Sequence, residues 1–469
     1  MEIHGIGILL KHELKVALKS QKMPIVNIVG AGLAGSEAAL QLAAAGIHVR
    51  LHEMRPGRPT AAHESGNCAE LVCSNSLGSK LPDRAGGVLQ AELRSLGCKL
   101  LPFAEQCAVP AGGALAVDRK QFAEAVTAAI VAEPLIELVR EEVVAVPSDG
   151  YTIISSGPLT SDLLATDIQK LSGNDNLAFF DAIAPVVVAD SIDTEIVFAA
   201  ARYDNGDADY LNIPLDKEQY YAFVDELLNA EKHSLKDFEA NDPKAKQFFE
   251  RCLPVEVIAA RGRDSLRFGP MRPVGLDDPR TGRWAYAVIQ LRKENLQGSL
   301  YNLVGFQTNL TYGEQERVLR TLPGMQNSEF ARLGSMHRNT FLNAPQMLDS
   351  TMKFRSRDDL FFAGQITGME GYLGNIGSGL IAGLNAARSI GGQPLLSPPR
   401  ETLLGSLCHH ISESPSSSFQ PMKAEFGLLP PLIPPVKKKE RKQAYANRSD
   451  AKMQEFRHNM GPTNTTSPV

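Results

Sequence analysis

The stretch that decides the fold is residues 25–53, which read IVNIVGAGLAGSEAALQLAAAGIHVRLHE. Its first five residues are an apolar, β-branched run with the length of a buried strand. A glycine-rich turn follows at residues 30–35, and residues 36–45 are rich in helix formers. Gly46 stands where helices commonly end, and residues 47–52 predict a second strand. The stretch therefore predicts a strand, a tight turn, a helix and another strand.

The spacing of the glycines in this turn is typical of dinucleotide binding. Gly30 allows the tight turn, Gly32 lets the backbone approach a pyrophosphate, and Gly35 lets the helix and the strand pack closely. The N–H groups at the helix start lie at the positive end of its dipole, which suits a diphosphate. Glu53 follows about 20 residues later, where an acid accepts hydrogen bonds from ribose hydroxyls. The expected cofactor-binding residues are Gly30, Ala31, Gly32, Leu33, Ala34, Gly35 and Glu53.

The composition is that of an ordinary globular protein with more than one domain. The chain has 469 residues, of which 43% are hydrophobic and 22% are charged. The formal charge of −5 gives no global attraction to nucleic acid, so an RNA site requires a local basic patch. No apolar run has transmembrane length, and no membrane partner is expected. The six cysteines lack CxxC spacing, which predicts no metal site, no disulfide framework and a reducing, cytoplasmic location.

Changes of pattern along the chain predict its division. Residues 1–23 are expected to be a disordered extension. Residues 24–181 and 325–411 carry the strands and glycine turns of a parallel sheet, as two parts of one nucleotide-binding domain. Residues 182–324 contain alternating segments and helical stretches, which predict an inserted α+β domain. Residues 412–469 are Pro-rich and carry a basic run, which predicts a tail with a short helix.

The parallel-sheet pattern returns at residues 360–365, which read LFFAGQ. A glycine-rich run follows, and a helix is expected at residues 380–390. Together with residues 25–53 and a strand that ends on SSG at residues 155–157, this layout resembles the glutathione-reductase-like FAD proteins. The resemblance implies an α/β, Rossmann-type FAD-binding domain whose last helix points its N-terminus at the flavin. It adds four expected cofactor-binding residues, Gly364, Gln365, Gly377 and Gly379.

Longer motifs narrow the resemblance. They are HEMRP at 52–56, ELVCSNSL at 70–77, GPLTS at 157–161, CLPVE at 252–256, LRFGPM at 266–271 and GQITGMEGY at 364–372. These motifs resemble the TrmFO family, the folate- and FAD-dependent tRNA uracil-5 methyltransferases. The resemblance extends from about residue 23 to residue 456. It departs at residues 373–377, LGNIG, which differ from the bulkier, more polar sequence of bacterial members at this flavin-facing turn.

The resemblance implies a specific reaction. Family members make 5-methyluridine at position 54 of the tRNA T-loop, with carbon from methylenetetrahydrofolate and electrons from reduced FAD, which NAD(P)H recharges. Uracil C5 is a poor nucleophile until a thiolate adds to C6 and turns the ring into an enolate. A base must then remove the C5 proton before hydride completes the methyl group. The expected partner is tRNA, and no protein partner is indicated.

Two cysteines lie in the matched motifs. Cys73 lies in a polar loop, and Cys252 precedes Leu253 and Pro254. Without the family motifs, each would more often be an inert small hydrophobic residue. The resemblance favours Cys252 as the nucleophile at C6 and Cys73 as the base or a flavin contact, and the reverse assignment stays open. Cys98 and Cys107 lie in no matched motif, and the inert interpretation suits them better.

Four arginines, Arg261, Arg263, Arg267 and Arg272, form a basic cluster in the expected inserted domain. One interpretation is a solvated face with scattered ion pairs. The other is a binding site for T-loop phosphates or for the glutamate tail of the folate. The sequence leaves both open.

Two alternatives to tRNA methylation also stay open. The first is the same chemistry on a uridine of ribosomal RNA. The second is a nicotinamide-dependent FAD oxidoreductase that acts on a small molecule. That class predicts a second GxGxxG for the nicotinamide cofactor, and residues 182–324 contain none.

Overall fold

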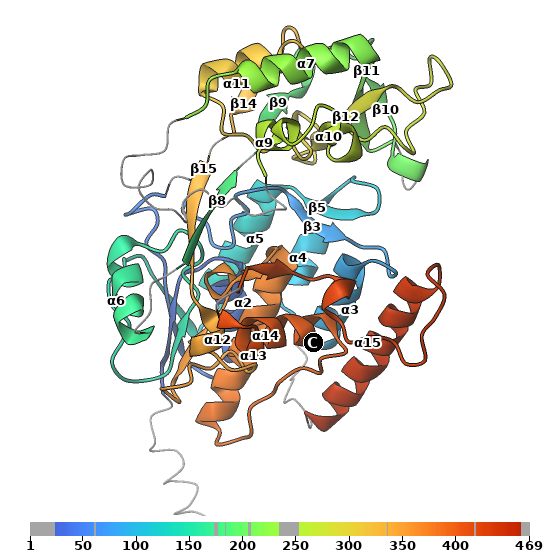
Figure 1. Cartoon of the computed structure of the whole chain (residues 1–469). Helices are drawn as coiled ribbons and strands as arrows, with labels where there is room; N and C mark the ends of the chain where they lie inside the picture. Colours follow the sequence, from blue (N-terminus) through green and yellow to red (C-terminus); the bar gives the residue numbers. More distant parts are fainter. Residues whose placement is uncertain are drawn as a thin grey trace, which may run out of the picture.

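The computed structural model describes residues 24–60, 62–172, 177–182, 184–204, 208–233, 253–334, 336–416 and 419–460. The expected N-terminal extension, residues 1–23, and Cys252 lie outside these described residues. Figure 1 shows two units, a larger one below and a smaller one above. Among the described residues, no helix combines the length and the apolar character needed to cross a membrane.

The lower unit is built on a five-stranded parallel sheet of order β16-β7-β1-β2-β6. The strands are β16 (Leu360–Phe362), β7 (Thr152–Ile154), β1 (Val26–Val29), β2 (Val49–His52) and β6 (Ile136–Val139). Helix α2 (Leu33–Ala44) joins β1 to β2, so the unit predicted from residues 25–53 is present. The chain first adds strands on one side of β1 and later adds β7 on the other side. The strand order therefore reverses between β1 and β7, where open α/β sheets bind ligands.

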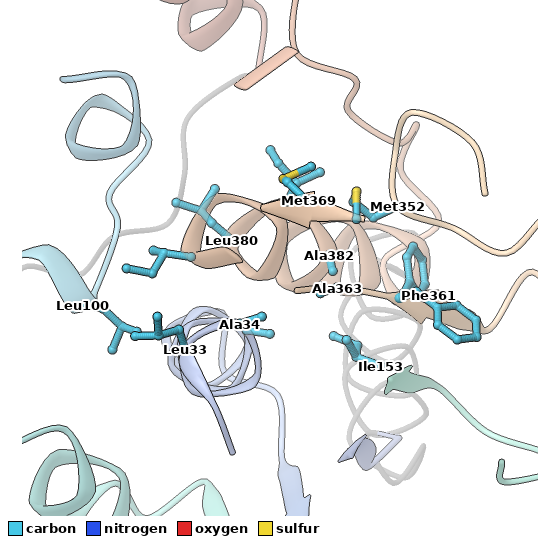
Figure 2. Close-up of a cluster of buried hydrophobic side chains, with 14 of the residues drawn as sticks. Leu33, Ala34, Leu100, Ile153, Met352, Phe361, Ala363, Met369, Leu380 and Ala382 are labelled. Atoms are coloured by element: carbon cyan, nitrogen blue, oxygen red, sulfur yellow. The ribbon is translucent and has the colours of Figure 1, made fainter. Parts of the chain in front are cut away.

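Helix α13 (Tyr372–Ile390) lies directly against α2 (Figure 2). A Cβ added at Gly379 would lie 2.1 Å from the carbonyl oxygen of Ala34, so only glycine fits at this contact. The expectation that this helix begins at residue 380 is wrong, because it begins at Tyr372. Gly374, Gly377 and Gly379, which precede the expected helix start, lie inside α13, where they permit close packing.

Further helices and small sheets surround the parallel sheet. The helices are α3 (Ala85–Ser95), α4 (Leu100–Gln106), α5 (Arg119–Ala132), α6 (Asp162–Ser172), α12 (Ala344–Met347) and α14 (Leu403–Glu413). One small sheet has the order β3 (Ser76–Ser79), β5 (Ala114–Val117), β4 (Ala108–Val109). The Asp118 side chain caps α5 by accepting a hydrogen bond of 3.1 Å from the N–H of Gln121. Within the described residues, no group of three or more His, Cys, Asp or Glu side chains is placed to hold a metal ion.

The segment after residue 412 is an integral part of the lower unit. Strand β18 (Met422–Lys423) pairs in parallel with β17 (Met369–Glu370). Helix α15 (Arg441–Asn459) has 19 residues, so the expectation of a short helix is wrong. It packs on α3 and buries Met453 and Phe456 in the same core as the parallel sheet. The few apolar positions of α15 are interspersed with many charged residues, so this packing is not evident from the sequence.

The upper unit contains a six-stranded sheet and its own hydrophobic core. In sheet order the strands are β10 (Phe198–Ala199), β11 (Tyr210–Leu215), β12 (Ala287–Lys293), β13 (Leu300–Leu303), β9 (Val186–Val188) and β14 (Phe330–Arg332). The helices are α7 (Lys217–Asn229), α9 (Val255–Ala260), α10 (Ser265–Phe268) and α11 (Tyr312–Leu319). Strand β14 lies beyond the expected domain boundary at residue 324. Strands β8 (Leu177–Ala182) and β15 (Met336–Phe341) form an antiparallel ribbon between the units (Figure 1).

Candidate active site

A cleft lies at the carboxyl ends of β1 and β7, where the strand order reverses. Open α/β sheets bind their ligands at such a position. The lining includes most of the residues expected to bind a cofactor: Gly30, Gly32, Leu33, Ala34, Glu53, Gly364 and Gln365. Ala31 lies in the same turn, and Gly35 lies in the first turn of α2.

The three glycines of the turn meet different surroundings. Gly30 has a φ of +99°, and a Cβ there would lie 2.6 Å from the carbonyl oxygen of Ser155. A Cβ at Gly35 would lie 1.9 Å from the carbonyl oxygen of Gly30. By contrast, a Cβ at Gly32 would meet no heavy atom within 4 Å, and Gly32 lines the cleft. Gly30 and Gly35 are therefore required by the fold, whereas Gly32 leaves open space beside the helix N-terminus.

The Glu53 carboxylate is held at the other side of this turn. Its Oε2 accepts a hydrogen bond of 3.1 Å from Ala31 N, and its Oε1 accepts bonds from Arg55 N at 3.0 Å and Arg55 Nε at 2.9 Å. Burial raises the pKa of Glu53, but the hydrogen bonds and charge of Arg55 outweigh burial, and the pKa lies below its usual value. A carboxylate has about four acceptor positions, so one stays available for a ligand hydroxyl.

Arg55 fixes the loop that covers this end of the cleft. Its side chain is only 3% exposed, and its Nη1 contacts Glu70 Oε2 at 3.1 Å. The same guanidinium donates to the carbonyl oxygens of Ser65 and Asn67, both at 3.1 Å. Arg55 therefore joins the end of β2 to the segment that leads to Cys73.

Tyr372 joins the Cys73 segment to the start of α13. Its hydroxyl oxygen accepts hydrogen bonds from Cys73 N at 3.0 Å and Ser74 N at 3.1 Å, and it donates to Ser74 O at 2.9 Å. Burial, and after it the charge of Cys73, raise the pKa of Tyr372, so the hydroxyl keeps its proton. Because Tyr372 also lines the cleft, the backbone of Cys73 is anchored beside it.

The same segment also contacts the upper unit. Asn75 is fully buried, and its Nδ2 donates to Lys293 O at 2.8 Å and to Val117 O at 3.1 Å. Its Oδ1 accepts a hydrogen bond of 2.8 Å from Arg292 Nε. The Cys73 segment therefore lies between the dinucleotide cleft and the six-stranded sheet.

A charged cluster lies at this junction. Arg119 Nε is 2.8 Å from Glu294 Oε2, and both side chains are largely buried. Burial, and then the positive charge of Arg119, lower the pKa of Arg332. Arg332 Nε and Nη2 are buried without a hydrogen-bond partner among the described residues. The cluster places positive charge near the protonated hydroxyl of Tyr372.

Comparison with known proteins gives the family. The family model described as glucose inhibited division protein A matches residues 25–394. A Desulfitobacterium hafniense protein named methylenetetrahydrofolate–tRNA-(uracil-5-)-methyltransferase TrmFO is 53% identical over 93% of this chain and 99% of its own length. A protein of the same name from Bacillus velezensis is 51% identical over 90% of this chain and 96% of its own length. This chain belongs to the TrmFO family.

Solved structures share the fold. GidA from Aquifex aeolicus, in its form II crystal, has a TM-score of 0.65 at 15% identity and covers 93% of this chain and 74% of that chain. The form I crystal has a TM-score of 0.64 at 16% identity. The shared fold and the sheet order confirm the predicted Rossmann-type α/β class.

Four of the cofactor-binding residues expected in this TrmFO-family chain follow β16, and only two of them line the cleft. Gly364 has a φ of +82° and lines the cleft, and the Gln365 side chain lines it too while its Nε2 donates to Glu370 at 3.0 Å. Gly377 and Gly379 do not line it. A Cβ at Gly377 would lie 2.7 Å from Leu404 Cδ1, so both residues lie at contacts between α13 and neighbouring helices.

The cysteines also differ in their surroundings. Cys73 is partly buried beside the cleft. Cys98 and Cys107 are buried in the lower core, and burial raises the pKa of both thiols, which keeps them protonated. Cys252 lies outside the described residues, which resume at Leu253 immediately before α9.

Two of the four arginines lie on tyrosine rings. The Arg267 guanidinium lies 3.7 Å from the centroid of Tyr286, and that of Arg263 lies 5.1 Å from the centroid of Tyr221. The two tyrosine hydroxyls are 3.0 Å apart, so these arginines form one surface group. Arg263 also contacts Asp225 at 2.6 Å. The other two predicted residues, Arg261 and Arg272, are exposed on the same unit.

The sequence analysis missed Arg55, Arg332 and Asn375 as site residues. Arg55 stands inside the HEMRP motif, but its partner Glu70 is far along the chain and no pattern links the two. Arg332 and Glu294 belong to the upper unit, and they lie near Arg119 of the lower unit only because the two units come together. Asn375 stands in the glycine-rich run before the expected helix at residues 380–390, whereas the structure places it inside α13.

Proposed function

We propose that this protein methylates C5 of a uridine in tRNA, using methylenetetrahydrofolate as carbon donor and reduced FAD as reductant. The names of the two relatives described above support folate-dependent methylation of uracil C5 in tRNA. The finer parts of the proposal are a T-loop target at position 54, NAD(P)H as electron source and a cytoplasmic location. The observation that carries it is the attachment of the Cys73 backbone to Tyr372 at the dinucleotide cleft.

The described residues fit FAD. Gly32 leaves open space at the N-terminus of α2, where a diphosphate is stabilised by N–H groups and the helix dipole. Glu53 keeps an acceptor position for a ribose hydroxyl. Gly364 and Gln365 line the same cleft as Tyr372. When bound, reduced FAD supplies hydride for the last step of methyl formation.

The two thiols share the remaining chemistry. We assign Cys252 as the nucleophile that adds to C6 of uracil, and Cys73 as the base that takes the C5 proton or as a contact to the flavin. The reverse assignment is the alternative. A nucleophilic thiolate requires positive charge nearby, and the Arg119–Arg332 cluster supplies it at the junction of the units.

We also assign the upper surface around Arg261, Arg263, Arg267 and Arg272 to tRNA. Planar guanidinium groups held on tyrosine rings keep their charge exposed for phosphate oxygens. Nearby, Phe268 is 80% exposed and Trp284 is 55% exposed, which offers flat apolar faces to unstacked bases. Capture of the folate glutamate tail is the alternative role for these arginines.

The test combines purified protein, NADPH, methylenetetrahydrofolate labelled in its transferable carbon and unmodified tRNA transcript. Labelled 5-methyluridine in the T-loop, detected by mass spectrometry of mapped fragments, is the expected result. Cys73→Ala and Cys252→Ala should each abolish labelling, whereas Cys107→Ala in the core should retain it. A flavin-bound protein that oxidises NADPH but labels only ribosomal RNA, or no RNA, would contradict the tRNA assignment.

A further inference from the structure

Asn375 is a buried polar residue without an evident structural role. It lies in the first turn of α13, after the N-cap Gly371, and is only 8% exposed. Its Oδ1 is buried and has no hydrogen-bond partner among the described residues. An unsatisfied buried amide costs about 1–3 kcal/mol, so native structures contain few of them.

A second asparagine in the same helix shows what a structural role looks like. Asn385 is fully buried, and its Nδ2 donates to Thr351 O at 2.9 Å and Leu396 O at 2.8 Å. Its Oδ1 accepts from Leu396 N at 2.7 Å. Asn385 therefore ties α13 to its surroundings with a satisfied amide. Asn375 does not, although it is nearly as well buried.

Asn375 instead lines the cleft, at the end where Gly364 and Tyr372 lie. The other polar side chains at this end are already engaged. Tyr372 bonds the Cys73 segment, and Gln365 Nε2 donates to Glu370. The neighbouring Gly374 faces the core, because a Cβ there would meet Met369 Cγ at 3.2 Å. The Asn375 amide is thus the uncommitted polar group that the described start of α13 presents to the cleft.

We infer that the Asn375 carboxamide binds and positions the pyrimidine edge of the flavin. This inference rests on the proposed FAD site. The flavin edge alternates carbonyl acceptors with an N–H donor, and a carboxamide carries one acceptor beside two N–H donors. A rotation of the terminal amide exchanges Oδ1 and Nδ2, so either atom can face the ring. The amide is uncharged, and it adds a directional contact to the positive end of the α13 dipole.

Replacement of Asn375 by an isosteric apolar residue should stabilise the FAD-free protein and weaken its binding of FAD. In Asn375→Leu, removal of an unsatisfied buried amide should raise the melting temperature of the FAD-free protein. The same change should raise the dissociation constant for FAD about ten-fold, the worth of one or two lost hydrogen bonds. Asn447→Leu, on the exposed face of α15, is the matched control and should change neither quantity. Flavin fluorescence titration and thermal unfolding measure both effects on the full chain.

A charged variant adds a readout that packing alone cannot move. Asn375→Asp should lower the midpoint potential of the bound flavin, because a negative charge beside the ring disfavours its reduced, anionic form. Wild-type protein that binds FAD, with unchanged affinity and potential in both variants, would overturn this inference and leave the proposed function intact. A lower melting temperature of the FAD-free Asn375→Leu protein would also overturn it. Wild-type protein that binds no FAD would overturn both.

Discussion

In the lower unit, the candidate cofactor residues are fixed by the backbone around them, whereas in the upper unit the candidate RNA residues are side chains at the surface. Gly35 approaches the carbonyl oxygen of Gly30 so closely that any side chain would collide with it. Arg263 and Arg267 extend over tyrosine rings and keep contact with solvent. A site built on backbone restricts residue types tightly, so it leaves a pattern in the sequence. A site built on surface side chains leaves no such pattern in the sequence, only a local excess of one residue type.

The largest effect is expected where the backbone is most crowded. Gly35→Ala should lower the free energy of unfolding by at least about 4 kcal/mol, because the added Cβ would lie 1.9 Å from Gly30 O. Gly32→Ala is the matched control, since a Cβ there meets no atom within 4 Å. It should leave the stability of the FAD-free protein unchanged and weaken FAD binding. Denaturant titration and flavin titration separate the two, and equal destabilisation by both changes would contradict this account.

The buried ion network of the lower unit gives the next effect. Arg55→Met would leave Glu53 and Glu70 without their shared cation, and breaking a buried pair in this way costs about 3 kcal/mol or more. Arg50→Met removes an exposed pair between Arg50 on β2 and Glu137 on the neighbouring strand β6, and it should change stability little. Chemical denaturation of the FAD-free proteins measures the difference. An equal loss of unfolding free energy in the two variants would contradict a larger contribution of the buried Arg55 network to stability.

These two predictions show what the sequence could and could not provide. The β1–α2–β2 unit was predictable because alternating apolar strands and obligatory glycines encode it locally. The Arg55–Glu70 contact depends on a loop closing over 15 positions, and no periodicity reports it. The start of α13 was not predictable from local sequence, because Gly379 packs against Ala34 of α2, which is distant in sequence. The buried side of α15 was hidden for the same reason, since its partners are on α3.

A pH dependence should distinguish the lower unit further. Glu92 is buried, accepts hydrogen bonds from Leu403 N and Leu404 N at 2.8 Å and from Ser449, and so joins α3 to α14 and α15. Burial raises its pKa to about 7. Between the ordinary value of 4.5 and about 7 the folded state binds more protons than the unfolded state, so stability falls as pH rises.

The expected loss is about 2 kcal/mol between about pH 5 and pH 7.5, measured by urea unfolding at each pH. Glu92→Gln should remove this part of the pH dependence. Glu105→Gln changes a carboxylate that pairs with Arg94 at the surface, and this variant should retain the pH dependence. An unchanged profile in Glu92→Gln would assign the dependence to other groups.

The smallest effect on the free energy of unfolding is expected in the upper unit. The same change is expected to weaken tRNA binding. Arg263→Ala removes an exposed pair with Asp225 and an exposed contact with the Tyr221 ring, so the free energy of unfolding should change by only about 1 kcal/mol or less. If the arginine contacts a phosphate, the variant should bind tRNA several-fold more weakly, with a salt dependence reduced by about one ion. Arg50→Ala on the lower unit provides the matched loss of one surface charge and should leave the salt dependence unchanged. Weaker binding of folate polyglutamate with unchanged tRNA affinity would reassign Arg263 to the folate tail, and the two units would then bind the cofactor and the carbon donor rather than the cofactor and the RNA.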